Sequence, residues 1–201
     1  MGYLIVKLAS RVRNIITRPA QEWIAIAGET TSHTELMEKY VAPLAAIAPI
    51  CSFLANLLLW HRSLLVTCVL AVLAFIMEFP YVLIVASIAD SAAASFGGER
   101  NPNGAVRLVA YAWTPRWLAG IFNLAPAIGA FAIPAATLYG FYLLYLGVKP
   151  IMRVPAERST VYVVVVVAAG ASVLIVVSLI LAVCYAILAG AASSLAPNLF
   201  H

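Results

Sequence analysis

Two charged side chains, Glu78 and Arg116, lie inside otherwise apolar stretches of the sequence and have the clearest capacity for chemistry. An ionised group at the centre of a bilayer costs about 2.5 to 3.5 kcal/mol, so it needs a partner or water. Glu78 falls near the middle of residues 64–88, and Arg116 falls about as deep within residues 105–124. Three interpretations stay open: a polar site that binds a proton, an ion or a headgroup; an ion pair that holds two helices in register; or an Arg116 that reaches the outer interface.

Enzyme motifs are missing around these residues. The sequence contains no HExxH, no GxSxG and no Walker loop. Its three histidines fall in separate polar segments, and its three cysteines fall in apolar stretches without the spacing of a zinc site or a disulfide framework. We therefore expect a non-enzymatic protein with no catalytic residue, no metal and no cofactor.

The elements that carry Glu78 and Arg116 are long apolar segments. Hydrophobic residues make up 64% of the 201 residues and charged ones 10%, whereas a soluble domain carries about 25% charged residues. A membrane-spanning helix needs about 20 mostly apolar residues. The sequence thus predicts an all-α polytopic membrane protein with five transmembrane helices, the third being weakest because charged residues and a proline interrupt it. The predicted spans are residues 41–60, 64–88, 105–124, 127–148 and 161–188.

An amphipathic helix is predicted ahead of the first span. Residues 3–18 place apolar side chains near the helical period and basic ones on an adjoining stripe, and Pro19 ends the pattern. Such a helix lies in the membrane interface, so we expect Lys7 and Arg11 to meet headgroups and Trp23 to lie at the same depth. Residues 28–34 are a predicted loop whose hydroxyl groups cap a helix beginning near Glu35.

Basic residues are distributed unevenly between the two sides of the predicted spans. Ten of the 12 fall on the side that holds the N-terminus, which favours a cytoplasmic N-terminus and an external C-terminus. This orientation of the last span holds even if the third and fourth segments form a re-entrant pair. The positive charge is scattered, which argues against nucleic-acid binding. The chain divides into a cytoplasmic segment (1–39), a five-helix membrane domain (40–188) and a C-terminal tail (189–201).

Prolines and small residues mark places where these helices bend or approach one another. A proline removes a backbone hydrogen bond, and broken helices line transporter sites. Prolines are also ordinary in spanning helices, and we favour that interpretation here. A run of small residues at 168–172 permits close helix packing or dimerisation. The residues concerned are Pro80, Pro115, Pro134 and Gly170.

Several short motifs resemble the Yip family (Ypt-interacting proteins) of five-span membrane proteins, above all its bacterial branch. They include Tyr111-Ala112-Trp113-Thr114-Pro115, then Leu124-Ala125-Pro126, then residues 139–148. The Pro19, Trp23 and Pro43 positions and Phe96-Gly97-Gly98 agree with them, and the resemblance covers residues 8–188. The acidic N-terminus and Asp-Leu-Tyr-Gly-Pro motif of the eukaryotic branch do not occur in this chain. The resemblance implies a five-helix bundle in a bacterial inner membrane.

The predicted function is non-enzymatic: membrane organisation, or interaction with lipids or partner proteins. The alternative is a small oligomeric transporter or channel with a polar site at Glu78 and Arg116. Membrane lipids are the expected partners, together with a second copy of the chain or another membrane protein. Water access to Glu78 distinguishes the two functions, because a transporter needs a polar path to that residue.

Overall fold

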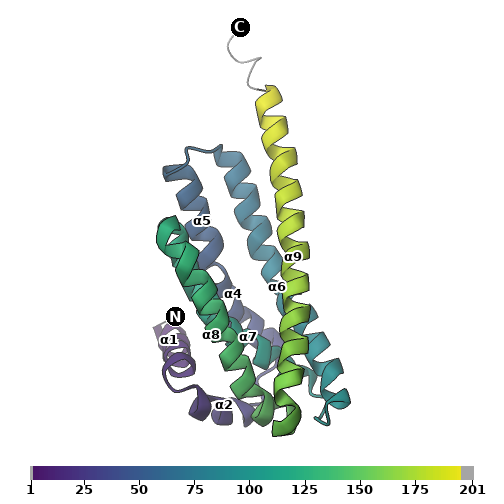
Figure 1. Cartoon of the computed structure of the whole chain (residues 1–201). Helices are drawn as coiled ribbons and strands as arrows, with labels where there is room; N and C mark the ends of the chain where they lie inside the picture. The colour runs from purple at the N-terminus through teal and green to yellow at the C-terminus, as the bar shows by residue number, and fades with distance from the viewer. Residues whose placement is uncertain (1, 196–201) are drawn as a thin grey trace.

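A computed structural model describes residues 2–195 of the chain, and these residues form helices and no strand. Four long helical rods run roughly along one axis, and a shorter helix, α7, is packed among them (Figure 1). The principal helices are α1 (Gly2–Thr17), α2 (Pro19–Ala27), α5 (Ile47–Leu58), α6 (Leu64–Ser95), α7 (Pro102–Ala119), α8 (Pro126–Met152) and α9 (Ala156–Leu195).

Four helical segments are long and apolar enough to cross a membrane, which agrees with a multi-pass membrane protein. Each contains or overlaps a predicted span and is longer than predicted. The additional turns lie mostly at the ends of the segments, where polar residues prevent a hydropathy pattern from locating the helix boundary. The segments are His33–Leu58, Leu64–Ser95, Pro126–Met152 and Ala156–Ala191.

The third predicted span, residues 105–124, is not among these four segments. Its residues instead form α7 and a 3-10 turn, η2 (Gly120–Leu124). Most of α7 is buried, including Arg107 and Thr114, because other helices surround it. A helix that faces protein on nearly all sides has no need of a continuous apolar surface. The prediction of five transmembrane helices is therefore not confirmed, and the structure supports four candidate spans.

The first span is irregular. It begins at α3 (His33–Leu36), passes through a π-helical turn η1 (Met37–Val41) and continues through α4 (Ala42–Ala45) into α5. The Ser32 side chain accepts a 3.2 Å hydrogen bond from the Glu35 amide, which confirms the predicted cap. The widened turn precedes Pro43, whose missing N–H interrupts the regular helical ladder.

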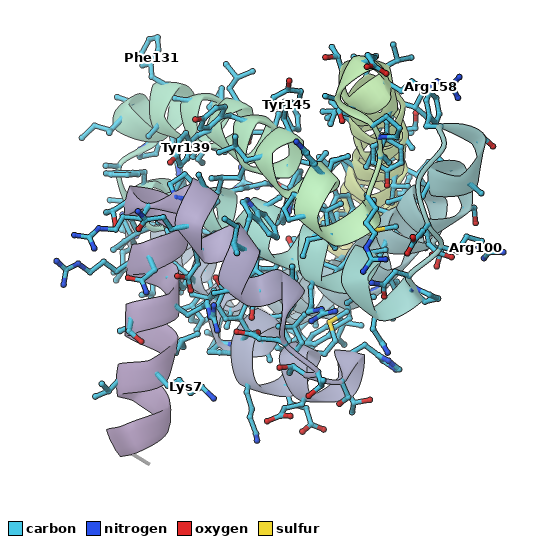
Figure 2. All side chains as sticks on the ribbon, turned by 90° about the horizontal axis from the view of Figure 1, so that it is seen from below. Lys7, Arg100, Phe131, Tyr139, Tyr145 and Arg158 are labelled. Atoms are coloured by element: carbon cyan, nitrogen blue, oxygen red, sulfur yellow. The ribbon has the colours of Figure 1, made fainter. Side chains whose placement is uncertain are left out.

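Helix α1 confirms the helical pattern expected over residues 3–18, whereas α2 was not predicted. Leu8 and Val12 of α1 are half-buried against the core and Ile15 is fully buried. The helix appears end-on in Figure 1 and lengthwise from below in Figure 2, so its axis runs across that of the bundle. The apolar face of α1 thus packs on the other helices.

A tight corner joins α6 to α7. Gly97 has a φ of 80°, and the amide of Gly98 donates to the carbonyl of Ala93 at 2.9 Å, which ends α6 in a glycine cap. Asp90 accepts hydrogen bonds from Arg100 and from the Asn101 amide, at 2.8 and 2.6 Å. Helix α6 runs on to Ser95, seven residues beyond the predicted end of the second span at residue 88.

At the other end, α9 continues to Leu195, so the predicted helix end at 188 is too early. The predicted tail, 189–201, is helical over its first seven residues, and residues 196–201 lie outside the described part of the chain. The upper part of α9 and the α5–α6 hairpin project beyond the top of α8 (Figure 1). The lower half of the bundle, which also carries α1, α2 and α7, is therefore wider than the upper half.

Candidate functional site

A groove with a volume of about 390 Å³ lies between α5, α6 and α9 in the narrow half of the bundle. One wall is a stripe of α6 residues at helical spacing, and α5 and the upper part of α9 complete it. Small side chains leave room between these helices. The lining residues are Ala48, Pro49, Ser52, Phe53, Asn56, Arg62, Thr67, Leu70, Ala71, Ala74, Glu78, Leu181, Ala182 and Tyr185.

The outer end of the groove carries a cation. Arg62, in the exposed turn between α5 and α6, lies over the ring of Tyr185 from α9 at 5.0 Å. A guanidinium above an aromatic face is attracted by the ring's negative centre, and Tyr185 therefore holds Arg62 at this end. The groove thus begins at a fixed positive charge.

Polar side chains continue down the α5 side. The Asn56 amide donates to the Ser52 carbonyl at 2.8 Å, and Asn123 of η2 donates to the Ser52 hydroxyl at 2.8 Å. Asn123 also donates to the Ala48 carbonyl at 3.3 Å, so η2 fixes the start of α5 beside the groove. These contacts place polar side chains along the α5 wall of the groove, although a surface that contacts only lipid acyl chains needs none.

Glu78 lines the inner end. Its Oε2 atom accepts a hydrogen bond of 3.0 Å from the indole nitrogen of Trp117, on α7. Among the described residues, Trp117 is the one hydrogen-bond donor to the Glu78 side chain. Because Trp117 is almost fully buried, the indole holds the carboxyl group at the boundary between the groove and the packed core.

Arg116 has different partners. Its guanidinium donates to the Thr137 hydroxyl at 3.4 Å and lies over the Trp113 ring at 5.4 Å. None of the ion pairs in the described part of the chain joins Arg116 to Glu78. The two residues therefore do not form the direct ion pair expected from the sequence, and whether either one has a functional role stays a prediction.

The three predicted helix breaks leave their helices continuous. Pro80 lies inside α6, Pro115 inside α7 and Pro134 inside α8, and each helix runs past its proline. Gly170 of α9 lies where a Cβ atom would come within 3.1 Å of the Tyr81 hydroxyl of α6. Gly170 thus allows two helices of the same chain to pack closely.

The predicted headgroup contact of Arg11 stays a prediction, and in the structure Arg11 has partners within the protein. Its guanidinium forms ion pairs with Glu22 and Glu29 and lies over the Tyr111 ring at 5.6 Å. Burial lowers the pKa of Arg11, but Tyr111, Glu29 and Glu22 raise it by more, so the pKa exceeds its ordinary value. Glu22 lies on α2. Because α2 was not predicted, the ion pair between Arg11 and Glu22 could not be predicted from the sequence. Lys7 is exposed, as expected.

The side chain of Trp23 is fully buried within the protein, and its predicted depth at the membrane interface stays a prediction. Its ring meets Tyr111 edge-to-face at 6.2 Å, and a Cβ atom at Gly147 would lie 2.7 Å from it. Gly147 of α8 therefore leaves the space that the indole fills. Trp23 packs α2 against α7 and α8. This packing role was not predicted, because Trp23 lies in a polar segment of the sequence.

Sequence reasoning missed several residues of the site. The sequence identified neither Arg62 and its partner Tyr185 nor Trp117 as the partner of Glu78. Arg107, which lies inside the third predicted span, is buried and donates to the Ile26 and Glu29 carbonyls. The position of Arg107 in a mostly apolar segment could have indicated its role, because a buried guanidinium needs hydrogen-bond acceptors.

These helices and this groove define a polytopic α-helical membrane protein. The family model of the Yip1 domain matches residues 13–178, and the chain belongs to that family. The predicted Yip resemblance is thereby confirmed. Neither the curated proteins nor the solved structures contain a match to the chain. Family membership fits a membrane protein in contact with lipids, and its particular role has to be argued from this molecule.

Proposed function

We propose that this protein is a non-enzymatic membrane-organising protein that acts on the bilayer through its wedge shape. The observation that carries the proposal is the difference between its two ends: α1, α2 and α7 widen the lower half, whereas among the described helices α5, α6 and α9 alone extend beyond the top of α8. A body that occupies more area in one leaflet than in the other fits best in a curved membrane.

Charge supports an orientation for the wedge. The wide end carries exposed basic side chains with no ion-pair partner among the described residues, including Lys7, Arg13 and Arg18. Cytoplasmic leaflets attract such side chains by about 1 kcal/mol each. We therefore propose that the wide end, with the N-terminus, lies on the cytoplasmic side of a bacterial inner membrane and that the chain ends outside.

Lipid contact along the narrow half supports the same proposal. Large apolar side chains of α9 are more than half exposed there, among them Val176, Leu179 and Val183. In water such a surface would be an aggregation site, whereas acyl chains match it. Partner proteins or a second copy could share this surface.

The test uses labelled protein in vesicles of graded diameter. With the wide end in the outer leaflet, protein density should rise as the vesicles become smaller. With the opposite insertion it should fall, and this reversal within one protein is the internal control. The orientation of each preparation is read from protease access to an N-terminal tag. Equal density at all diameters in both orientations contradicts the proposal.

The groove at Glu78 favours a second candidate function, a small transporter or channel. A groove beside an irregular first span, with some polar side chains in its wall and a carboxyl group at its inner end, resembles the discontinuous-helix sites of transporters. Passage across the whole membrane would need a second path from Glu78 or another copy of the chain. Proton or cation flux into proteoliposomes, lost in Glu78→Gln, tests this candidate.

A further inference from the structure

We infer that the groove is a water-filled path from its Arg62 end to Glu78, and that the Glu78 carboxylate takes up a proton through it. The inference deepens the second candidate function and does not depend on the wedge. It rests on the groove, on the polar side chains of Ser52 and Asn56 within its mostly apolar lining, and on the Glu78 carboxyl group at its inner end.

The path has the length that proton delivery to the membrane interior requires. Thr67 and Glu78 line the same groove from one helix, eleven positions apart. At 1.5 Å per residue they are about 16 Å apart along α6. Half of a bilayer's hydrocarbon core is about 15 Å. With Arg62 among the headgroups, Glu78 therefore lies near the midplane.

Polar groups that can bind water lie along the path, although most of its lining is apolar. Ala71, Ala74 and Ala182 leave space, while Ser52 and Asn56 present oxygen atoms beside it. Water needs two to four polar partners at its site. An acyl chain in the groove would remove water from the Glu78 carboxyl group, which has one hydrogen bond from the described residues.

The charges around the groove favour a proton over a metal cation. Arg62 stands at the mouth and Arg116 lies on the neighbouring helix α7, while Tyr185 is the titratable group that α9 contributes. A hydrated metal ion must pass the fixed positive charge as a whole. A proton passes between water molecules instead. Transfer from a hydronium ion to Glu78 leaves a neutral carboxyl group and one water molecule.

The first experiment maps water in the groove with cysteine substitutions. Cys51, Cys68 and Cys184 are first replaced by alanine. Ala74→Cys places a thiol in the groove, and Ile76→Cys places one at nearly the same depth on the lipid-facing side of α6. A membrane-impermeant, charged thiol reagent is then added on the Arg62 side of oriented vesicles.

Ala74→Cys should react about tenfold faster than Ile76→Cys, because the reacting thiolate forms only where water reaches it. Equal rates at the two positions overturn the inference, since they mean that lipid or packing fills the groove. Both variants change residues outside the Glu78–Trp117 contact, so loss of that contact does not confuse the comparison.

The second experiment observes the proton. Infrared difference spectra of the protein between acidic and alkaline pH should contain the carbonyl band of a neutral carboxyl group, and Glu78→Gln should remove that band. The control is Glu99→Gln, whose side chain is exposed and paired with Arg153. A band unchanged in Glu78→Gln overturns proton uptake at this residue. If proteoliposomes show no flux but the Glu78 band is present, the transport function fails while proton uptake at Glu78 stands. The two proposals are therefore tested separately.

Discussion

The Tyr139 hydroxyl donates a 2.7 Å hydrogen bond to the carbonyl oxygen of Ile16, a residue 123 positions earlier in the chain. Tyr139 belongs to α8 and Ile16 to the last turn of α1, where the carbonyl groups have no partner within the helix. Figure 2 shows Tyr139 beside the end of α1. The N-terminal helix is thus tied to the bundle through its backbone as well as through Ile15.

Tyr139→Phe should loosen α1 without disturbing the bundle. A neutral hydrogen bond contributes about 1 kcal/mol, so the population of detached α1 should rise about fivefold. Trypsin cleavage after Arg13 in detergent measures that population. Tyr145→Phe, which changes an exposed hydroxyl of the same helix, is the control. Equal cleavage in the two variants would mean that the bond does not hold α1.

Glu78 should be coupled energetically to Trp117 more strongly than to Arg116. Hydrogen bonds to charged groups contribute about 1.5–3 kcal/mol, and residues without a shared contact add within about 0.5 kcal/mol. Double-mutant cycles combine Glu78→Met with Trp117→Phe or with Arg116→Met, and unfolding in detergent measures stability. A larger coupling with Arg116 would restore the ion pair predicted from the sequence.

Gly98→Ala should destabilise the corner between α6 and α7. A Cβ atom there would lie 2.6 Å from the Met152 carbonyl oxygen, against the start of the α8–α9 turn. Overpacking of this kind costs about 1–3 kcal/mol. Gly28→Ala is the matched control, because its Cβ atom would meet the nearest atom at 3.6 Å. Thermal unfolding in detergent should separate the variants, and equal melting temperatures would contradict the steric argument.

The two ends of the chain should lie on opposite sides of the membrane. The ten basic residues on the N-terminal side favour a cytoplasmic N-terminus, and α9 runs from the wide end toward the narrow end. A reporter fused after His201, which lies outside the described residues, should be active only if it requires export. This orientation needs α7 to carry the chain back toward the narrow end in addition to the four candidate spans, and α7 does run antiparallel to α8, since Leu108 and Ala112 lie against Gly147 and Gly140. Cytoplasmic activity of that fusion would contradict the orientation.

Periodicity and apolar length predicted most of the helices because each signal is local. Residues 3–18 have helical spacing before Pro19, and the structure has α1 there. Residues 64–88 are continuously apolar and form most of α6. The α7 segment was predicted as a membrane span and forms a helix, but it is not among the candidate spans. Hydropathy reports how well a segment suits lipid, whereas α7 is enclosed by protein.

The candidate site was less accessible to such reasoning because its contacts join distant segments. The unusual charge of Glu78 was visible in the sequence, but its partner was assigned by opposite charge. The structure gives Glu78 an indole from Trp117, one position beyond Arg116. One position along a helix turns a side chain by about 100°. Charge and depth alone could not choose between those two neighbours.

Membrane thickness should place little constraint on where this protein resides. Its four candidate spans contain 26, 32, 27 and 36 residues, all more than the about 20 that cross a hydrocarbon core. Long apolar helices adapt to thin and thick bilayers by tilting, at a fraction of a kcal/mol per Å of mismatch. Sorting by thickness, which acts on proteins with short spans, would therefore discriminate weakly against this chain.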